Sequence, residues 1–371
     1  MKWTNKFNGD TGFVYGTTDI YENIDNNICN KIASFDLDNT LIRTSSGATF
    51  AKNSEDWKLE YDNVKDVLKK YQDNGYKIII ITNQGGIGNS EDKLSTFKKK
   101  IEQIEKKISP VKFEIYCLIF KDFHRKPYPT ILENINFDRK TSFYCGDAAG
   151  RYSDFADTDI KFAYNAMIKF KLPEEIFTTS KSREHIPNKI EYPIVPFEYG
   201  MICREPYNFK LNDVSKPELI IMVGLPASGK SSFAQNIIKN NDIKYISMDI
   251  IGTKVKMIKN IKACASNRSN ILIDNTNLEI SVRKELIDIV KSINNEYYIT
   301  VIHINTSIER CKHNNCYRYY VGRTKFISEL VYRIMQKKLL VPQYTENPDI
   351  NRIITVEPDV PYDIRYINYY L

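Results

Sequence analysis

The sequence lacks the features of membrane and secreted proteins. None of its apolar runs reaches the ~18 residues that a membrane-spanning helix needs. The first ten residues, MKWTNKFNGD, lack the apolar segment of a secretory signal. The seven cysteines are scattered and odd in number, which does not suit a disulfide framework. These absences predict an intracellular protein, nuclear or cytoplasmic and not secreted, with no membrane partner.

A strong charge of one sign is also absent. The chain has 53 Lys and Arg residues against 46 Asp and Glu residues, and the net charge of +7 permits a polyanionic partner without requiring one. With 42% hydrophobic and 27% charged residues, the composition is that of a packed protein. The length of 371 residues suits two domains.

Apolar runs of strand length alternate with segments of helical period, which predicts α/β architecture. Strands are expected at 31–37, 76–83, 113–120, 141–147, 218–224, 270–277 and 297–304, and helices at 62–75 and 91–107. The lysines at 98–100 are assigned to the solvated face of the second helix. The pattern lapses in a proline-dotted stretch, so we expect a domain over 1–175, an irregular linker packed between domains over 176–217, and a second domain over 218–371.

A phosphate-binding loop stands in the second half, in the stretch MVGLPASGKSS. Gly224, Gly229, Lys230 and Ser231 fit the pattern G-x-x-x-x-G-K-[ST] between an apolar strand and a helix. The glycines allow backbone N–H groups to surround phosphate oxygens at a helix N-terminus. Lys230 is expected to contact the β- and γ-phosphates of ATP, and the Ser231 hydroxyl to bind Mg²⁺.

A kinase also needs a group that activates the phosphate acceptor. Asp249 follows a strand-like segment and is our candidate for this base; it could also cap the helix that follows, and both roles are compatible. Asp274 ends an apolar run and resembles the acidic residue that accompanies such loops. Arg318, in the polar stretch KHNNCYRYYVGR, is expected to cover the phosphates as part of a lid.

The first half carries the stretch SFDLDNTLI, in which two aspartates follow a buried strand. Alternate residues of a strand share a face, so we expect the carboxylates of Asp36 and Asp38 to converge on one site. One can attack phosphorus while the other handles the proton of the leaving alcohol, and Mg²⁺ would offset their repulsion. Thr82 could bind the phosphoryl oxygens, Lys126 could neutralise them, and Asp147 could complete the metal site.

These features, in this order, resemble the four motifs of haloacid-dehalogenase phosphatases. From about residue 30 to its end, and more weakly before that, the chain resembles the bifunctional polynucleotide kinase 3′-phosphatases. The shared stretches occur in the family's order: FDLDNTLI, SSGATFAKNSEDWKL, ITNQGGIG, RKP, GDAAGR, GLPASGKSS, IDNTN and HNN. The resemblance implies two doubly wound parallel-sheet domains, haloacid-dehalogenase-like and then P-loop kinase. The family's fourth motif often carries a further acid, and the next one here after Asp147 is Asp154.

The resemblance also implies the roles of individual residues. Asp36 would form an aspartyl-phosphate, Asp38 would act as general acid and then base, and Asp249 would activate a 5′-hydroxyl toward ATP. Further binding positions are implied for the phosphate of the first reaction (Asn83, Arg125), for ATP (Ser228, Ser232) and for the 5′-hydroxyl end (Asp274, Asn277, Arg283).

The partners expected from this resemblance are DNA strand ends, bound by a monomer. Two alternatives stay open at this point: the same activities on RNA, which differs by its 2′-hydroxyl, and a catalytically weakened protein that binds DNA ends. Fewer than forty residues precede Asp36, so we expect no forkhead-associated domain and no binding to phosphopeptide scaffolds.

Overall fold

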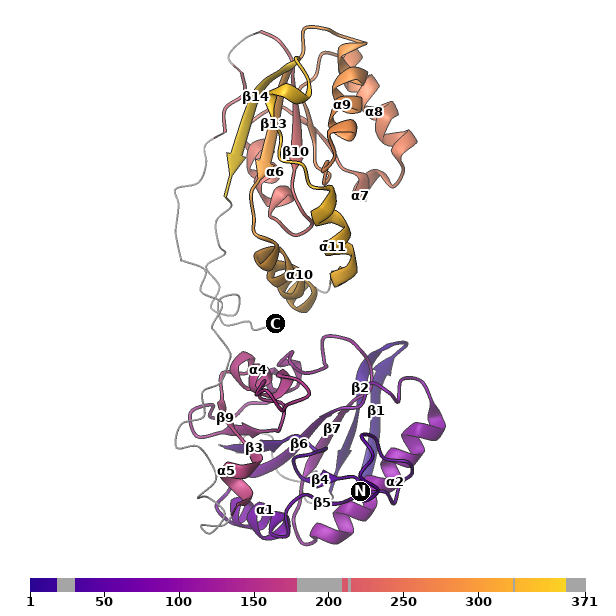
Figure 1. Ribbon diagram of the computed structural model, residues 1–371, viewed down its shortest axis with the longest axis vertical. Coiled ribbons are helices and arrows are strands. Elements are labelled where there is room, and N and C mark those ends of the chain that lie inside the picture. Colours follow the sequence, from indigo (N-terminus) through magenta and orange to yellow (C-terminus); the bar gives the residue numbers. More distant parts are fainter. Residues whose placement is uncertain (19–30, 179–208, 213–214, 323, 358–371) are drawn as a thin grey trace. The chain divides into compact units, whose positions relative to one another are not determined.

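The computed structural model describes residues 1–18, 31–178, 209–212, 215–322 and 324–357. The chain divides into two compact units, the first holding the described residues up to 178 and the second those from 209 onward (Figure 1). The expected linker over 176–217 falls for the most part outside the described residues, and so does its expected packing between domains.

Unit 1 is built on a seven-stranded sheet in the order β1-β2-β7-β6-β3-β8-β9. The strands from β7 to β9 are parallel, whereas β1 and β2 form an antiparallel edge that pairs with β7. Parallel strands are covered on both faces, which explains why β3 is buried throughout and β6 contains the run IIII. The strands are β1 Lys2–Asn8, β2 Thr11–Thr17, β3 Ile32–Phe35, β6 Lys77–Asn83, β7 Glu114–Leu118, β8 Phe143–Cys145 and β9 Lys169–Lys171, with a separate pair, β4 Ile42–Arg43 and β5 Lys58–Leu59.

Helices cover both faces of this sheet. One apolar core lies under α1 and α2, which contribute Leu68 and Phe97, and a second core includes Ile160 and Phe162 of α4. Their bounds are α1 Val64–Asp73, α2 Glu91–Ile108, α3 Thr130–Glu133, α4 Thr158–Asn165 and α5 Pro173–Phe177.

Unit 1 contains more elements than the sequence predicted, and two of the differences bear on the sheet edge and on helix α2. The hairpin β1–β2 was not expected, because β1 is largely polar and exposed and the apolar run of β2 is only the three residues FVY. The assignment of all three lysines at 98–100 to a solvated face was wrong, since Lys100 is only 7% exposed. It stands three residues after Phe97 and so shares the buried face of α2.

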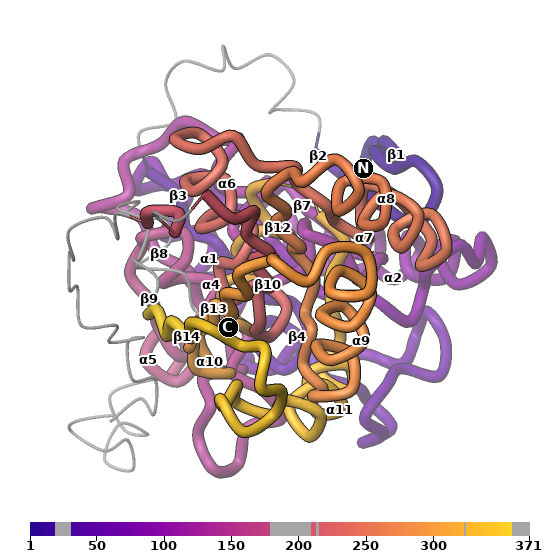
Figure 2. The backbone as a smooth tube through the Cα atoms, turned by 90° about the horizontal axis from the view of Figure 1, so that it is seen from above, coloured from indigo at the N-terminus to yellow at the C-terminus, as the bar shows by residue number. Residues whose placement is uncertain are grey.

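Unit 2 contains a parallel five-stranded sheet in the order β11-β12-β10-β13-β14. Helices α8 and α9 lie side by side over one face (Figure 2), and α6 packs on the other. The strands are β10 Glu218–Val223, β11 Lys244–Ile246, β12 Ile271–Ile273, β13 Tyr298–Ile304 and β14 Ile350–Val356, and the helices are α6 Lys230–Lys239, α7 Met248–Ile251, α8 Lys254–Ser266, α9 Ile280–Lys291, α10 Ile308–Gly322 and α11 Glu329–Lys338, with the short η3 Tyr344–Glu346.

Sequence patterns missed several elements of unit 2, among them helix α11. The edge strand β14 was not expected, and the polar stretch expected to act as a lid is the helix α10. No helix in the described part of the chain combines the length and the apolar character needed to cross a membrane.

Candidate active sites

The carboxyl ends of β3, β6 and β8 meet at one edge of the unit 1 sheet, where α/β folds commonly place their ligands. Asp36 directly follows β3, and its backbone N–H donates to the carbonyl of Cys145 at the end of β8, at 2.8 Å. Asp147 follows β8, and Thr82 and Asn83 end β6. The fold therefore brings four of the predicted site residues to the same edge.

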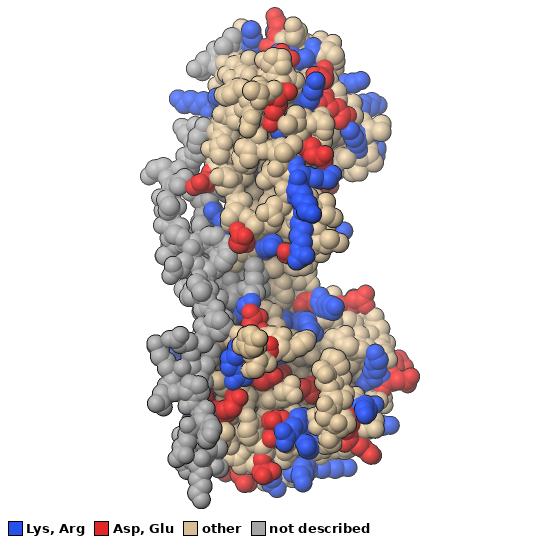
Figure 3. All heavy atoms as spheres, in the orientation of Figure 1, with Lys and Arg blue, Asp and Glu red and all other residues tan. Residues whose placement is uncertain are grey.

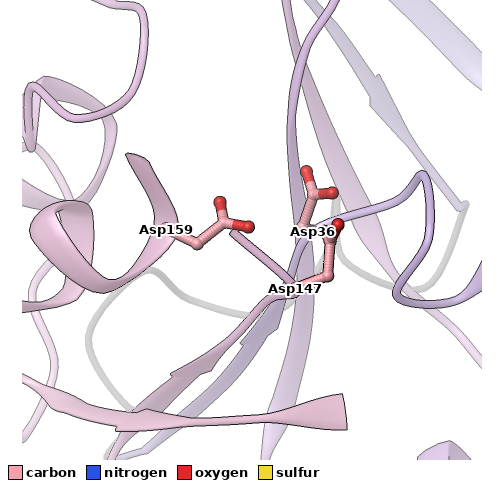
Figure 4. Close-up of side chains that lie close together, drawn as sticks. All are labelled: Asp36, Asp147 and Asp159. Carbon is pink, nitrogen blue, oxygen red and sulfur yellow. The ribbon is translucent and has the colours of Figure 1, made fainter. Parts of the chain in front are cut away.

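Three carboxylates converge there from two strand ends and a helix. Each of Asp36, Asp147 and Asp159 offers an oxygen, and these oxygens lie within 4.8 Å of one another (Figure 4). The Lys126 ammonium group donates to Asp36 Oδ1 at 2.6 Å, to Asp159 Oδ1 at 2.7 Å and to the Tyr144 hydroxyl at 2.7 Å. Lys126 is thus the cation at the centre of a buried carboxylate cluster.

Burial shifts the pKa values of the charged groups in this cluster. It raises the pKa of Asp36 well above its usual range, although the nearby Lys126 opposes the rise. Burial and the charge of Asp159 raise the pKa of Asp147 to about 6. For Lys126, burial alone would lower the pKa, but the two carboxylates outweigh it and raise the pKa. Three carboxylates facing one ammonium group suit a hard divalent cation such as Mg²⁺, which prefers oxygen ligands.

Contrary to the expectation, Asp38 does not join this cluster. Its carboxylate accepts a hydrogen bond from Gln84 Nε2 at 2.6 Å and lies 3.5 Å from Lys100 Nζ. The strand ends at Phe35, and the chain then turns at Asn39, which has a φ of 59°, so the two-residue alternation of a strand no longer applies. The carboxylates of Asp36 and Asp38 therefore engage different partners, and among the described residues the third carboxylate of the cluster is Asp159.

Asp154, the acid considered as a possible metal partner, has another task. Its carboxylate accepts from the backbone N–H groups of Ala149 and Arg151 and from the Arg151 side chain at 2.9–3.1 Å. It organises the loop after Asp147 and stands outside the cluster. The sequence offered little sign of Asp159, which lies twelve residues beyond Asp147 in the first turn of α4.

The expected phosphate-binding residues lie around the cluster. Asn83 receives the backbone N–H of Lys126 at 3.0 Å and donates to its carbonyl at 3.2 Å, so it fixes the lysine's backbone. Buried Thr82 accepts from Gln84 Nε2 at 3.0 Å. Arg125 packs on Gly85, where an added Cβ would lie 2.8 Å from Nη1, and this nitrogen is buried without a hydrogen-bond partner in the described structure. Arg125, the residue before Lys126, therefore has a buried donor with no hydrogen-bond partner among the described residues.

In unit 2 the glycine loop has the backbone that its sequence predicted. Gly224 and Gly229 have φ values of 154° and 102°, and a Cβ on Gly224 would lie 2.9 Å from Ser228 Oγ. Glycine is required at Gly224 because a side chain there would fill the cradle. Lys230 and Ser231 begin α6, as does Ser232, so these residues stand at a helix N-terminus suited to phosphate.

Lys230 is buried, and its ammonium group donates to the carbonyl of Leu225 at 2.6 Å, within its own loop. Burial lowers its pKa to about 8, while the charge of Asp274 opposes this shift. Helices α10 and α11 hold the loop from outside, because Asn314 donates to the carbonyl of Ala227 and Tyr332 to that of Pro226. The exposed Arg318 lies on α10.

The two predicted acids of unit 2 differ in environment. Asp274 is buried beyond β12 and accepts a hydrogen bond from the Tyr245 hydroxyl at 2.6 Å. Asp249 is exposed in the short helix α7. The alternative that Asp249 caps a helix was wrong, since Ser247 and Thr253 hold the N-cap positions of α7 and α8.

Two residues expected at the 5′-hydroxyl end are instead parts of the framework. Arg283 is 1% exposed, pairs with Glu346 through two hydrogen bonds of 2.9 and 2.5 Å, and donates to the carbonyls of Asn277 and Leu278. Asn277 is buried and donates to the carbonyl of Met222. The resemblance implied a substrate contact for both residues, but in the structure both are buried and hydrogen-bonded to the framework.

Sequence reasoning also missed two residues in contact with Asp38, namely Gln84 and Lys100. A signal for Lys100 was available, because Phe97, Lys100, Ile101 and Ile104 follow the spacing of a single helix face. A lysine on an apolar face needs a partner when it is buried, and Asp38 is that partner.

The folds and sites together define a class: a haloacid-dehalogenase-like phosphatase unit followed by a P-loop kinase unit. Residues 31–177 match the family described as polynucleotide kinase 3 phosphatase, and residues 219–339 match an AAA domain family.

Relatives that align with most of this chain identify the family within this class. A bifunctional polynucleotide phosphatase/kinase of Schizosaccharomyces pombe is 35% identical over 325 residues, which cover 85% of this chain and 77% of the relative. A putative bifunctional polynucleotide phosphatase/kinase of Acanthamoeba polyphaga mimivirus is 33% identical, covering 88% and 84%. The chain belongs to the bifunctional polynucleotide phosphatase/kinase family and is an enzyme with a phosphatase and a kinase domain. A polynucleotide 3′-phosphatase of Saccharomyces mikatae is 29% identical over 40% of this chain and 85% of its own length.

Proposed function

We propose that this enzyme heals broken DNA ends by removing 3′-phosphates in unit 1 and phosphorylating 5′-hydroxyls in unit 2. A strand break with these two termini cannot be ligated, and the two reactions together convert both ends. The observation that carries the proposal is the buried contact of 2.6 Å between Asp36 and Lys126 within the carboxylate cluster. It combines a nucleophile with a cation able to neutralise phosphate oxygens.

In the first step of the phosphatase reaction, a carboxylate oxygen of Asp36 attacks phosphorus and the bond to the 3′ oxygen breaks. Asp38 gives a proton to the departing oxygen, and Lys126 with Arg125 stabilises the negative charge on the phosphoryl group. Mg²⁺ held by Asp36, Asp147 and Asp159 would neutralise charge in the cluster.

In the second step water attacks the aspartyl-phosphate, Asp38 accepts the proton of that water, and inorganic phosphate leaves. The position of Asp38 outside the carboxylate cluster suits these two proton transfers. Asp38 accepts a hydrogen bond from Gln84 and stands outside the three-carboxylate cluster, so it can exchange protons with alcohol and water.

The kinase reaction would use the glycine loop as a cradle for ATP. Lys230 would move from the Leu225 carbonyl to the phosphates, Ser231 would hold Mg²⁺, and exposed Asp249 would take the proton of the 5′-hydroxyl. Several basic side chains gather over α11 on the face displayed in Figure 3, and this helix carries Arg333, Lys337 and Lys338. Such charge would favour a polyanionic strand.

The test uses oligonucleotides with a 3′-phosphate or a 5′-hydroxyl, each as DNA and as RNA, with Mg²⁺ and with or without ATP. We expect phosphate release from the 3′ end without ATP, and ATP-dependent labelling of the 5′ end. If the RNA strands are turned over as fast as the DNA strands or faster, we would conclude that RNA and not DNA is the substrate. Binding of DNA ends without either product would reduce the protein to an end-binding function.

A further inference from the structure

Asp38 is held by two side chains from separate elements. Gln84, just after β6, donates to Oδ2 at 2.6 Å, and Lys100 of α2 approaches Oδ1 at 3.5 Å. Each carboxylate oxygen therefore has its own donor. Gln84 Nε2 also contacts Thr82 Oγ1 at 3.0 Å, which ties this arrangement to the end of β6.

The Lys100 side chain is buried on helix α2. Its side chain is 8% exposed, and the ammonium group also lies 5.4 Å from the centre of the Phe97 ring. Helix α2 is anchored to the sheet edge, because Trp3 of β1 donates to Glu102 at 3.2 Å. Burying an ammonium group is costly unless it is paired, so this placement has a structural cost that the contact with Asp38 offsets.

The two lysines near the site pair with different carboxylates. The Lys126 ammonium group donates hydrogen bonds to Asp36 and Asp159, the two most buried carboxylates of the cluster. Asp38 has Lys100 as its own cation, and this separation keeps the Asp38 carboxylate apart from the buried cluster that Asp36 forms.

We propose that Lys100 is a positioning residue for the phosphatase reaction, which holds the Asp38 carboxylate where it can pass its proton to the leaving 3′ oxygen. The inference rests on the role of Asp38 in the proposed function. A misplaced Asp38 slows expulsion of a poor leaving group such as a sugar alkoxide. It matters little for p-nitrophenolate, which departs without a proton.

The experiment compares Lys100→Met with the wild type for two substrates, a DNA oligonucleotide 3′-phosphate and p-nitrophenyl phosphate. Release of the alcohol or phenol in a single turnover reports the first step alone. Because positioned acids contribute ~10²–10⁴-fold, we expect a loss of about 10- to 100-fold on the oligonucleotide and less than about 3-fold on p-nitrophenyl phosphate. Lys100→Arg should recover part of the oligonucleotide rate.

The matched control is Lys99→Met, an exposed lysine of the same helix, which should leave both rates unchanged. Kinase activity measured on each variant reports correct folding of unit 2, and far-UV circular dichroism reports the whole chain. Equal losses on the two substrates would assign Lys100 a purely structural role, and no loss on either would also overturn the inference.

Asp38→Asn separates this inference from the proposed function. If Asp38→Asn loses activity selectively on the oligonucleotide but Lys100→Met does not, the inference for Lys100 fails alone. If Asp38→Asn affects both substrates equally, the proposed role of Asp38 is wrong.

Discussion

The two units handle the same chemical group with different materials. In unit 1 the site consists of buried side-chain charges from several elements, already paired with one another around Lys126. In unit 2 it consists mainly of backbone, shaped by Gly224 and Gly229, with one buried lysine resting on a carbonyl of its own loop. In the proposed reactions, unit 1 supplies a nucleophile from the protein, whereas unit 2 chiefly supplies a cradle for the phosphates of ATP. A substitution that inactivates one of the two sites should therefore leave the activity of the other site intact.

The largest effect is expected from Asp36→Asn. Without its nucleophile, unit 1 should lose 3′-phosphate release on the order of 10⁴-fold or more, while ATP-dependent 5′ labelling continues. Phosphate release and transfer of labelled phosphate from ATP measure the two activities in one preparation. Asp62→Asn, at an exposed acid of the same unit, is the control. Loss of both activities in a folded protein would show that the two centres depend on one another.

Lys230→Met should produce the reverse pattern. Removing the cation that faces the phosphates should lower 5′ labelling by roughly 10³-fold, and 3′-phosphate release should continue. Methionine preserves the buried stem, and Lys239→Met changes an exposed lysine of the same helix as a control. A kinase rate within about tenfold of wild type would argue against Lys230 as the phosphate-binding lysine.

Arg283→Ala sharpens the comparison because it tests a residue that the structure assigns to the framework. Breaking its buried pair with Glu346 leaves an uncompensated carboxylate, which should cost unit 2 about 3 kcal/mol of stability. Denaturant titrations followed by kinase and by phosphatase activity should show a lower midpoint for the kinase alone. Lys284→Ala serves as the exposed control. An unchanged midpoint with a raised KM for the 5′-hydroxyl strand would return Arg283 to the substrate site.

The smallest expected effect is the uptake of protons by unit 2 when ATP binds. Burial lowers the pKa of Lys230 to about 8, so near this pH part of the protein carries a neutral lysine. Bound phosphates favour the ammonium form and raise the pKa again, so ATP binding should take up a fraction of a proton at pH 8 and almost none at pH 6.5. Calorimetry in buffers of different ionisation enthalpy measures this uptake. Lys230→Arg stays charged and should abolish it, and uptake that persists in this variant would implicate another group.

Local patterns were sufficient for much of the molecule. The runs that became β3, β6 and β10 were recognisable because buried parallel strands are apolar without interruption. The glycine loop was recognisable because its backbone conformation permits few residue types. The hairpin β1–β2 and the edge strand β14 escaped notice, since edge strands have less continuous burial to record in their sequence.

The sites were less predictable wherever side chains meet from distant segments. Asp159 and Lys100 lie 123 and 62 positions from their partners Asp36 and Asp38 in the numbering of the chain. Arg283 was predicted to contact substrate, but its partner Glu346 lies beyond two further helices.

By itself, the sequence determined the α/β class, the order of a phosphatase and a kinase domain, and the residues Asp36, Lys126 and Lys230 around which each site forms. These depend on local periodicity and on short motifs whose chemistry admits few alternatives. Only the tertiary structure decided which acid stands beside Asp36, which lysine serves Asp38, and which arginine is buried. Those outcomes depend on pairing charges in a low-dielectric interior, and the partners become neighbours only when the chain has folded.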